Sequence, residues 1–453
     1  MNFSDSGNII VVGGNAAGSA AAAKAKRVNP KANVILFEAT EFISTGTCEL
    51  PYVLSGKIGD YNEIIFFTPE KFYHEKGVKV FNFHKVESIN KRAKLVNVID
   101  LKIGESKTFE YDKLILTTGS RPKEIENIPS TLDNVFTIKS VTDLIKIENY
   151  LTDNAVKKAA VFGAGYIGVE ISEALKKLNL CVSLFDINEM PMADSEDEIQ
   201  SIILNHIKSN GVEFYGKCEN LQVYKENNRL TKIKADGYLK EFDVFFSTAG
   251  IEPNIDLAKS CKLEIGKLGG IKTDNRCKTS DPHIYAAGDC IEVKNKITNR
   301  PDYFPMATMA HAQGHVAGTN AAGGFNKLNP AIKNIAVKVF DKVYTSVGLK
   351  ESEALKFNRN VKSVSAEIPN LVKVMPESSS VFAKIVYDDY SKNILGASFI
   401  GEKEVVGYAD LISSLIYNKS SVESLAEMDF NYTPPMSPFI NILSVLGRKI
   451  IRG

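Results

Sequence analysis

The chain has 453 residues, which suggests about three domains at roughly 150 residues each. Its hydrophobic fraction of 44%, charged fraction of 24% and net charge of +1 are ordinary for a soluble protein and exclude a global basic field that would attract nucleic acid. The N-terminus lacks a basic leader, and no later stretch reaches the ~18 apolar residues of a membrane span. We therefore expect a cytoplasmic protein that binds neither nucleic acid nor membranes.

The first 40 residues have the pattern of a dinucleotide-binding unit: an apolar strand, a glycine turn, a helix and a second strand with an acidic end. These parts are residues 8–12, 13–18, 19–27 and 33–38. Gly13 permits the tight turn and Gly18 permits close packing of helix on strand, whereas Asn15 replaces the usual middle glycine. Glu38 can accept hydrogen bonds from an adenosine ribose. The predicted cofactor contacts are Gly13, Gly14, Ala17, Gly18 and Glu38.

Cys48 follows in a stretch, residues 44–52, that has the pattern of a helix start. Pro51 fits the first helical turn, so Cys48 is expected at the positive end of the helix dipole, which favours the thiolate. An inert, packed thiol is the alternative. The remaining cysteines show neither CxxC nor metal-ligand spacing, so we expect reduced thiols and no metal site; they are Cys181, Cys218, Cys261, Cys277 and Cys290.

A second copy of the unit starts about 150 residues later and has all three glycines of the motif. Its strand, turn, helix and second strand are residues 159–162, 163–168, 169–178 and 182–186. Asp186 suits a free ribose 2′-hydroxyl and would repel a 2′-phosphate, which favours NADH over NADPH. Two bound dinucleotides are implied, unless one unit is a decayed duplicate. The predicted contacts here are Gly163, Gly165, Tyr166, Ile167, Gly168 and Asp186.

We expect the chain to return to these units in three further segments. Residues 111–122 form an apolar strand that ends in small residues, Thr118 and Gly119, and residues 244–250 repeat this design up to Gly250. In residues 279–289 an apolar strand ends in Gly-Asp, and the carboxylate of Asp289 can bind a chain of polyol hydroxyls.

Together these motifs resemble the pyridine nucleotide-disulfide oxidoreductases over nearly all of residues 1–330. The resemblance implies an α/β fold with two doubly wound, Rossmann-like dinucleotide-binding domains and a C-terminal α+β dimerisation domain. It also implies FAD in the first unit, with Glu38 on its ribose and Asp289 on its ribityl chain, and NADH or NADPH in the second. Tyr166 matches the residue that gates the flavin, although a packing aromatic is the alternative, and Glu170 matches the residue that meets the nicotinamide.

The segment after about Pro330 looks like the interface domain of this family, which implies a homodimer. Its strand-like and helix-like segments are residues 335–339, 345–349, 381–387 and 405–417. Tyr432 is held in an extended segment by the following Pro434 and Pro435, and it could donate a proton or hydrogen bond across the dimer or simply pack. The expected domains are 1–122 with 251–330 for FAD, 123–250 for NAD(P)H and 331–453 for dimerisation.

Within the family, Cys48 has no partner cysteine at position 51 or 53, so it must cycle as a mixed disulfide or as a sulfenic acid. The run Leu50-Pro51-Tyr52, with Ser44 before the cysteine, resembles coenzyme A (CoA) disulfide reductases. NADH peroxidases and oxidases, the sulfenic-acid branch, usually have a histidine where this chain has Ala16. Two positions depart from the reductases: Glu49 stands for a glycine, and Val374-Met375 for a tyrosine before Pro376.

The resulting hypothesis is a FAD-dependent NAD(P)H oxidoreductase that reduces CoA disulfide, or a related small disulfide or persulfide, through Cys48 and Tyr432. Lys24 and Arg27 on the first helix, with Ser44, are the expected substrate contacts, because the basic residues can hold a CoA phosphate. A solvated basic face is the alternative for this pair. The alternatives for the whole chain are an NADH oxidase or peroxidase, and a non-enzymatic redox sensor.

Overall fold

The computed structural model describes residues 7–452 except residues 220, 236 and 359. Its first part is built on a five-stranded parallel sheet in the order β20-β9-β1-β2-β5. The strands are β1 (Asn8–Val12), β2 (Asn33–Phe37), β5 (Lys79–Phe81), β9 (Lys113–Leu116) and β20 (Ile284–Ala286). This order brings together segments from both sides of the second nucleotide unit.

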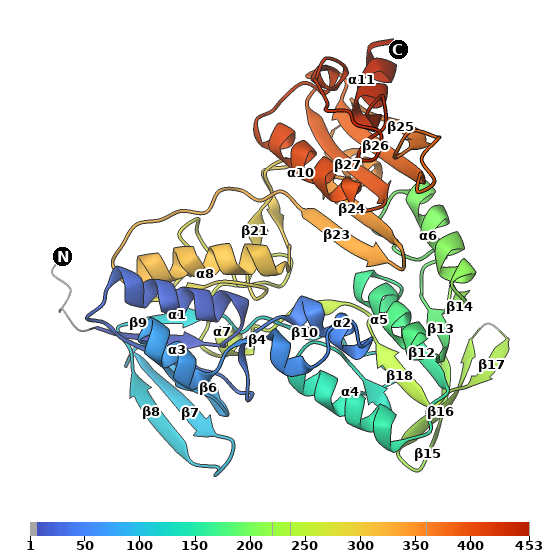
Figure 1. Ribbon diagram of the computed structural model, residues 1–453. Helices are drawn as coiled ribbons and strands as arrows, with labels where there is room; N and C mark the ends of the chain where they lie inside the picture. Colours follow the sequence, from blue (N-terminus) through green and yellow to red (C-terminus); the bar gives the residue numbers. More distant parts are fainter. Residues whose placement is uncertain (1–6, 220, 236, 359, 453) are drawn as a thin grey trace.

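Both faces of this sheet are covered, which explains why its strands are continuous apolar runs. On β1, Ile9 and Val11 pack against α1 (Ala16–Val28) and α8 (Ala307–Ala321), which lie side by side in Figure 1. The alternate residues Ile10 and Val12 face the antiparallel sheet β6-β7-β8. The strands of that sheet are His84–Asn90, Leu95–Asp100 and Ser106–Glu110.

The second nucleotide unit repeats the first in topology. Its parallel sheet has the order β11-β18-β12-β13-β14, with an antiparallel sheet, β15-β16-β17, on one face. The parallel strands are Val135–Phe136, Val244–Ser247, Lys158–Phe162, Cys181–Phe185 and Val212–Tyr215, and the antiparallel ones Gln222–Glu226, Arg229–Ala235 and Tyr238–Glu241. The helices of the other face are α4 (Val141–Asp153), α5 (Tyr166–Lys177) and α6 (Asp197–Ser209).

The two units are joined by a short antiparallel pair, β10 (Ser120–Pro122) with β19 (Ile251–Pro253). Pro122, the proline at which residues 111–122 predict a domain crossover, is the last residue of β10. Small elements complete the first two units: β3 (Ile43–Thr45), η1 (Thr47–Glu49), α2 (Leu50–Leu54), η2 (Tyr61–Ile64), β4 (Ile65–Phe67), α3 (Pro69–Lys76), α7 (Asp256–Ser260), β21 (Val293–Lys294) and β22 (Pro301–Asp302).

The C-terminal domain is a five-stranded antiparallel sheet, β23-β24-β27-β26-β25, with α10 and α11 packed on it. The strands are Asn334–Val339, Lys342–Gly348, Ile394–Gly401, Ser380–Asp388 and Val361–Pro369; the helices are α9 (Glu351–Ala354), α10 (Glu404–Tyr417), η3 (Val422–Ala426) and α11 (Ile442–Arg452). The predicted strands and helix here correspond to β23, β24, β26 and α10, whereas β25, β27 and α11 were not anticipated.

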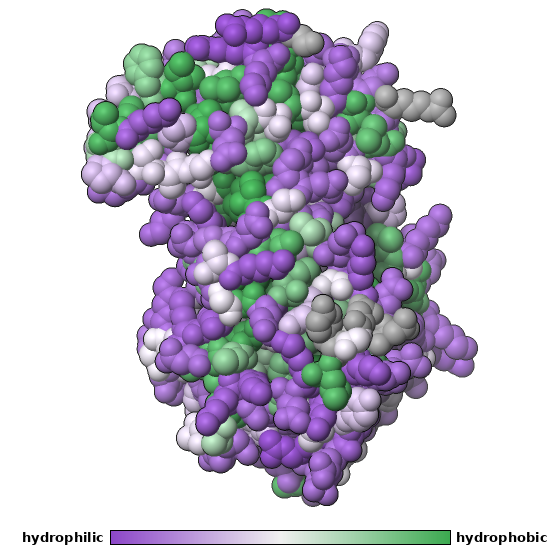
Figure 2. All heavy atoms as spheres, turned by 90° about the vertical axis from the view of Figure 1, so that its right-hand side faces the viewer, coloured by the Kyte–Doolittle hydropathy of each residue, from purple (hydrophilic) through white to green (hydrophobic). Residues whose placement is uncertain are grey.

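The surface is mostly hydrophilic on the face that Figure 2 shows, and apolar side chains gather at its upper end, over the C-terminal domain. Large exposed side chains of this domain include Val374, Tyr432, Met436, Phe439 and Ile440. Among the described helices, none is both long and apolar enough to cross a membrane.

Candidate active site

The first glycine turn has backbone positions that only glycine tolerates. Gly13 has a φ of 100°, and a Cβ on Gly18 would lie 1.7 Å from the carbonyl oxygen of Gly13. The Glu38 carboxylate accepts hydrogen bonds from the amides of Gly14 (2.7 Å) and Thr40 (2.8 Å). Each carboxylate oxygen can accept more than one hydrogen bond, so Glu38 retains capacity for a ribose. Ala17 is buried and packs closely against Gly288, beside Asp289.

The second turn repeats this geometry at three corresponding positions. Gly163 has a φ of 99°, a Cβ on Gly168 would lie 1.8 Å from the Gly163 oxygen, and Asp186 accepts from the Ala164 amide at 2.6 Å. A Cβ on Gly165 would meet no atom within 4 Å, so this backbone is open to a phosphate. Both turns therefore fit a dinucleotide, and the decayed-duplicate alternative finds no support in their backbone geometry.

Asn15, the departure from the glycine motif, joins the first turn to the cysteine segment. Its Oδ1 accepts a hydrogen bond from the amide of Thr45 at 3.1 Å, and the amide of Ser44 donates to the Gly14 carbonyl at 2.8 Å. Ser44 has a φ of 50°, a sparsely populated conformation that this pairing fixes. The chain that carries Cys48 is thus held directly against the predicted FAD turn.

Cys48 lies in η1 immediately before α2, and Pro51 occupies the first turn of that helix as predicted. Its side chain is exposed, but desolvation by the surrounding protein raises the pKa of the thiol, and the carboxylates of Glu49 and Glu170 raise it further. The prediction that the helix dipole leaves a low-pKa thiolate is therefore wrong. The helix has only five residues, so its dipole is weak, whereas desolvation and the nearby carboxylates both disfavour the thiolate.

One cation opposes this effect, and no sequence pattern had indicated it. Lys139 lowers the pKa of Cys48, and its Nζ lies 3.2 Å from Oδ2 of Asp289. The same oxygen of Asp289 accepts from the Ser120 hydroxyl at 2.8 Å. Thr118 and Gly119, predicted as cofactor contacts, lie just before Ser120, and Gly119 has a φ of 67°. Lys139 precedes α4 and is far in sequence from both Cys48 and Asp289.

After the second glycine turn, Tyr166 begins α5 and Glu170, the residue predicted to meet the nicotinamide, lies one turn later. The Tyr166 hydroxyl is buried with no hydrogen-bond partner among the described residues, and desolvation raises its pKa. Burial raises the pKa of Glu170 to about 7. The Tyr52 hydroxyl donates a hydrogen bond to this carboxylate at 3.3 Å, and this hydrogen bond lowers the pKa. Ile167 lies between these two residues on the same helix, and Gly250, with a φ of 97°, follows β18.

The predicted substrate contacts Lys24 and Arg27 lie on α1 and are accompanied by two histidines of α8. The rings of His311 and His315 are 4.5 Å apart. Desolvation lowers the pKa of His315, and His311, Lys24 and Arg27 lower it further, so the four side chains form one basic cluster. The spacing of four residues in a helix pattern was the only sequence signal for the histidine pair.

Tyr432 lies outside helix and strand, as predicted, and its ring packs edge-on against Phe439 with centroids 5.3 Å apart. The side chain is 45% exposed. Its predicted approach to Cys48 concerns the partner subunit and stays a prediction.

Two family models match the chain: "Pyridine nucleotide-disulphide oxidoreductase" over residues 7–314, and the dimerisation domain of the same family over residues 335–442. The chain belongs to the pyridine nucleotide-disulphide oxidoreductase family. These matches confirm the resemblance and the expected fold class. Membership implies FAD and a pyridine nucleotide as cofactors. The protein is therefore an NAD(P)H-dependent flavin oxidoreductase.

Curated relatives match along almost the whole chain. A CoA-dependent NAD(P)H sulfur oxidoreductase of Pyrococcus furiosus is 30% identical over 98% of both chains. A coenzyme A disulfide reductase of Staphylococcus aureus is 27% identical over 97% of this chain and 99% of its own. An NADH oxidase of Methanocaldococcus jannaschii is 28% identical over 98% of both chains. The crystal structure of reduced Bacillus anthracis CoADR-RHD superposes with a TM-score of 0.93 and 28% identity, covering 99% of this chain and 80% of that one.

Proposed function

We propose that this protein reduces CoA disulfide, or a persulfide of similar chemistry, with electrons from NAD(P)H through Cys48. The observation that carries the proposal is the position of this exposed thiol. It is fastened to the first glycine turn through Asn15 and lies close enough to Lys139 and Asp289 for their charges to act on it. The other exposed cysteine, Cys181, begins β13, a strand of the second unit.

The proposed chemistry is thiol–disulfide exchange. The Cys48 thiolate attacks one sulfur of the disulfide, a mixed disulfide forms, and one CoA thiolate leaves. Two electrons from NAD(P)H cleave that bond, and a proton from solvent gives the second CoA thiol and restores the Cys48 thiolate. FAD, held by the first turn, Glu38 and Asp289, would carry these electrons between nucleotide and sulfur. Lys139 favours the attacking thiolate because its positive charge lowers the pKa of Cys48.

The basic cluster of Lys24, Arg27, His311 and His315 supports CoA as the carrier of the sulfur. CoA has three phosphate groups, which Lys24 and Arg27 can bind by charge-assisted hydrogen bonds, while the imidazole N–H groups of His311 and His315 can donate further hydrogen bonds. The Pyrococcus furiosus relative is itself CoA-dependent by name. We also propose that the resting enzyme holds Cys48 in a mixed disulfide with CoA and that Ser44 contacts this CoA.

The proposal also includes a homodimer in which Tyr432 of one subunit reaches Cys48 of the other. The exposed apolar side chains around Tyr432, which are Met436, Phe439 and Ile440, support an interface at this segment. A tyrosine hydroxyl there could donate a proton to the leaving thiolate.

The deciding experiment is the mass of the Cys48 peptide from purified protein under non-reducing conditions, together with NADH consumption in the presence of CoA disulfide. A CoA adduct and CoA-disulfide-dependent turnover are the expected results. An unmodified thiol and no turnover with CoA disulfide or a CoA persulfide would refute the proposal.

A second candidate is an NADH oxidase that cycles Cys48 through a sulfenic acid. It is favoured by the Methanocaldococcus jannaschii relative of that name. In this case the Cys48 peptide carries added oxygen in place of CoA, and NADH consumption follows dissolved oxygen without any disulfide.

A further inference from the structure

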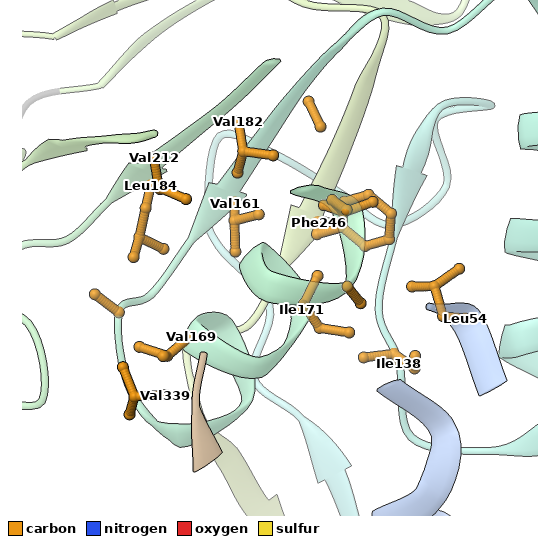
Figure 3. Close-up of a cluster of buried hydrophobic side chains, with 14 of the residues drawn as sticks. Leu54, Ile138, Val161, Val169, Ile171, Val182, Leu184, Val212, Phe246 and Val339 are labelled. Atoms are coloured by element: carbon orange, nitrogen blue, oxygen red, sulfur yellow. The ribbon is translucent and has the colours of Figure 1, made fainter. Parts of the chain in front are cut away.

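Helix α2, which directly follows Cys48, is anchored to the second nucleotide unit. Leu50 and Leu54 belong to the same buried cluster as Val169 and Ile171 of α5. Figure 3 shows Leu54 and Ile138 on one side of this cluster, next to Ile171. Because this packing is apolar and buried, α2 has a fixed position relative to α5.

A polar contact joins the two helices at the edge of that core. The Tyr52 hydroxyl donates a hydrogen bond to Oε1 of Glu170 at 3.3 Å. Both side chains are partly buried, and they line a narrow crevice together with Pro51, Ser55, Glu173, Ala174 and Lys177. Tyr52 is four residues after Cys48, whereas Glu170 is the residue expected to meet the nicotinamide, so the contact spans the two halves of the proposed site.

We propose that Tyr52 is a positioning residue that holds the Glu170 carboxyl against the cysteine helix, so that one carboxyl acts on both the nicotinamide side and Cys48. This inference rests on the proposed function and deepens it. Glu173 lies on α5 one turn after Glu170. It forms ion pairs with Lys177, at 2.8 Å, and with Lys338 of β23, so these two cations pair with Glu173. The Tyr52 hydroxyl donates to Glu170 itself.

The groups that face Glu170 set its protonation in a definite direction. Desolvation raises its pKa to about 7, and Glu173 raises it as well, whereas Tyr52 and Lys338 lower it. Glu170 in turn raises the pKa of Cys48. Loss of the Tyr52 hydroxyl therefore makes the ionised carboxyl less stable, and neutralising Glu170 makes the Cys48 thiolate more stable.

The test is an infrared titration of the FAD-loaded protein. The C=O band of protonated Glu170 is assigned by its absence in Glu170→Gln and followed against pH in the wild type and in Tyr52→Phe. We expect the midpoint to rise by about 0.5 to 1 pH unit in Tyr52→Phe, because one hydrogen bond to the carboxylate is lost while the ring still packs. An unchanged midpoint would overturn the proposal.

Tyr150→Phe is the matched control. Its hydroxyl donates to the Asp243 carbonyl at 3.0 Å, so this variant loses a tyrosine hydroxyl in the same unit without touching Glu170. A similar midpoint rise in this control would also overturn the proposal. The second readout is the pH dependence of Cys48 alkylation after reduction of the protein, which we expect to move to lower pH in Glu170→Gln; no movement would contradict the link to Cys48. Neither readout needs disulfide turnover, so a failure here is distinct from a failure of the proposed function.

Discussion

Asn15 and Thr45 form the hydrogen bond that fastens the cysteine segment to the first glycine turn, with 3.1 Å between Oδ1 and the amide nitrogen. The second turn has glycine at the corresponding position, where a Cβ would meet open space. The proposed function gives this asymmetry a reason: the second turn would only have to admit a phosphate, whereas the first would also have to position the thiol of Cys48.

Asn15→Gly tests this division of roles. We expect the variant to retain FAD, because glycine at this position suits a pyrophosphate, but to loosen the cysteine segment by about 1 kcal/mol, the usual net value of one hydrogen bond. Hydrogen exchange of the Thr45 amide is the measurement. Exchange as slow as in the wild type would contradict the role given to Asn15.

Cys48→Ser should keep FAD and the oligomeric state while disulfide reduction falls almost to zero, because serine is a poor nucleophile and cannot form the mixed disulfide. Cys181→Ser is the matched control, since this cysteine is also exposed but lies on β13. Substantial disulfide turnover in Cys48→Ser, measured as the rate of NADH consumption with CoA disulfide, would remove Cys48 from the mechanism.

We expect the preference between NADH and NADPH to depend on Asp186. Its carboxylate already accepts hydrogen bonds from the amides of Ala164 and Asn188, and its negative charge would repel a 2′-phosphate. NADH should therefore bleach the flavin faster than NADPH, and Asp186→Ala should narrow the difference. Flavin reduction traces with both nucleotides provide the check, and equal or better efficiency with NADPH in the wild type would refute this preference.

The pH dependence of stability should carry the signature of Glu170. The pKa of this carboxyl is about 7 in the folded protein against 4.5 ordinarily, so the folded state binds an extra proton between these values. Stability therefore falls as pH rises through this window, by up to roughly 3 kcal/mol. Glu170→Gln should remove that part of the slope in denaturant titrations at pH 4.5 to 7.5. A slope identical to that of the wild type would show that Glu170 is not the group responsible.

The sequence was sufficient for the elements whose signal is local. The glycine turns, Glu38 and Asp186 follow from a short motif, and their geometry in the two units agrees in detail. The contacts that tune the site join distant segments: Lys139 reaches Asp289 across 150 positions and Tyr52 reaches Glu170 across 118. Periodicity and spacing carry no information about such pairs, because they depend on how two separate units pack.

The pKa of Cys48 illustrates the same limit. The local pattern correctly predicts a cysteine before a helix that has Pro51 in its first turn. The direction of the pKa shift was wrong because desolvation, the adjacent carboxylate of Glu49 and the carboxylate of Glu170, a residue from another unit, all raise the pKa. A thiol with a raised pKa makes any nearby cation or proton donor more important for turnover.

Tyr432→Phe tests the donor proposed from the partner subunit. The substitution keeps the ring that packs against Phe439 and removes only the hydroxyl, so dimerisation should survive. If the hydroxyl protonates the leaving thiolate, disulfide turnover should fall by roughly 10²- to 10⁴-fold, the usual value of general-acid help. Flavin reduction by NADH is a separate half-reaction and should be unchanged.

Val374 and Met375 occupy the positions where a second tyrosine would stand in related reductases, and Val374 is 87% exposed. No phenol at these positions can therefore mask the loss in Tyr432→Phe. Stopped-flow traces of both half-reactions decide between the roles: a slowed disulfide step with normal flavin reduction supports the donor, whereas an unaltered disulfide step leaves Tyr432 as a packing residue. The raised pKa of Cys48 strengthens the expectation, because a site that disfavours thiolates gains most from a group that stabilises the one being released.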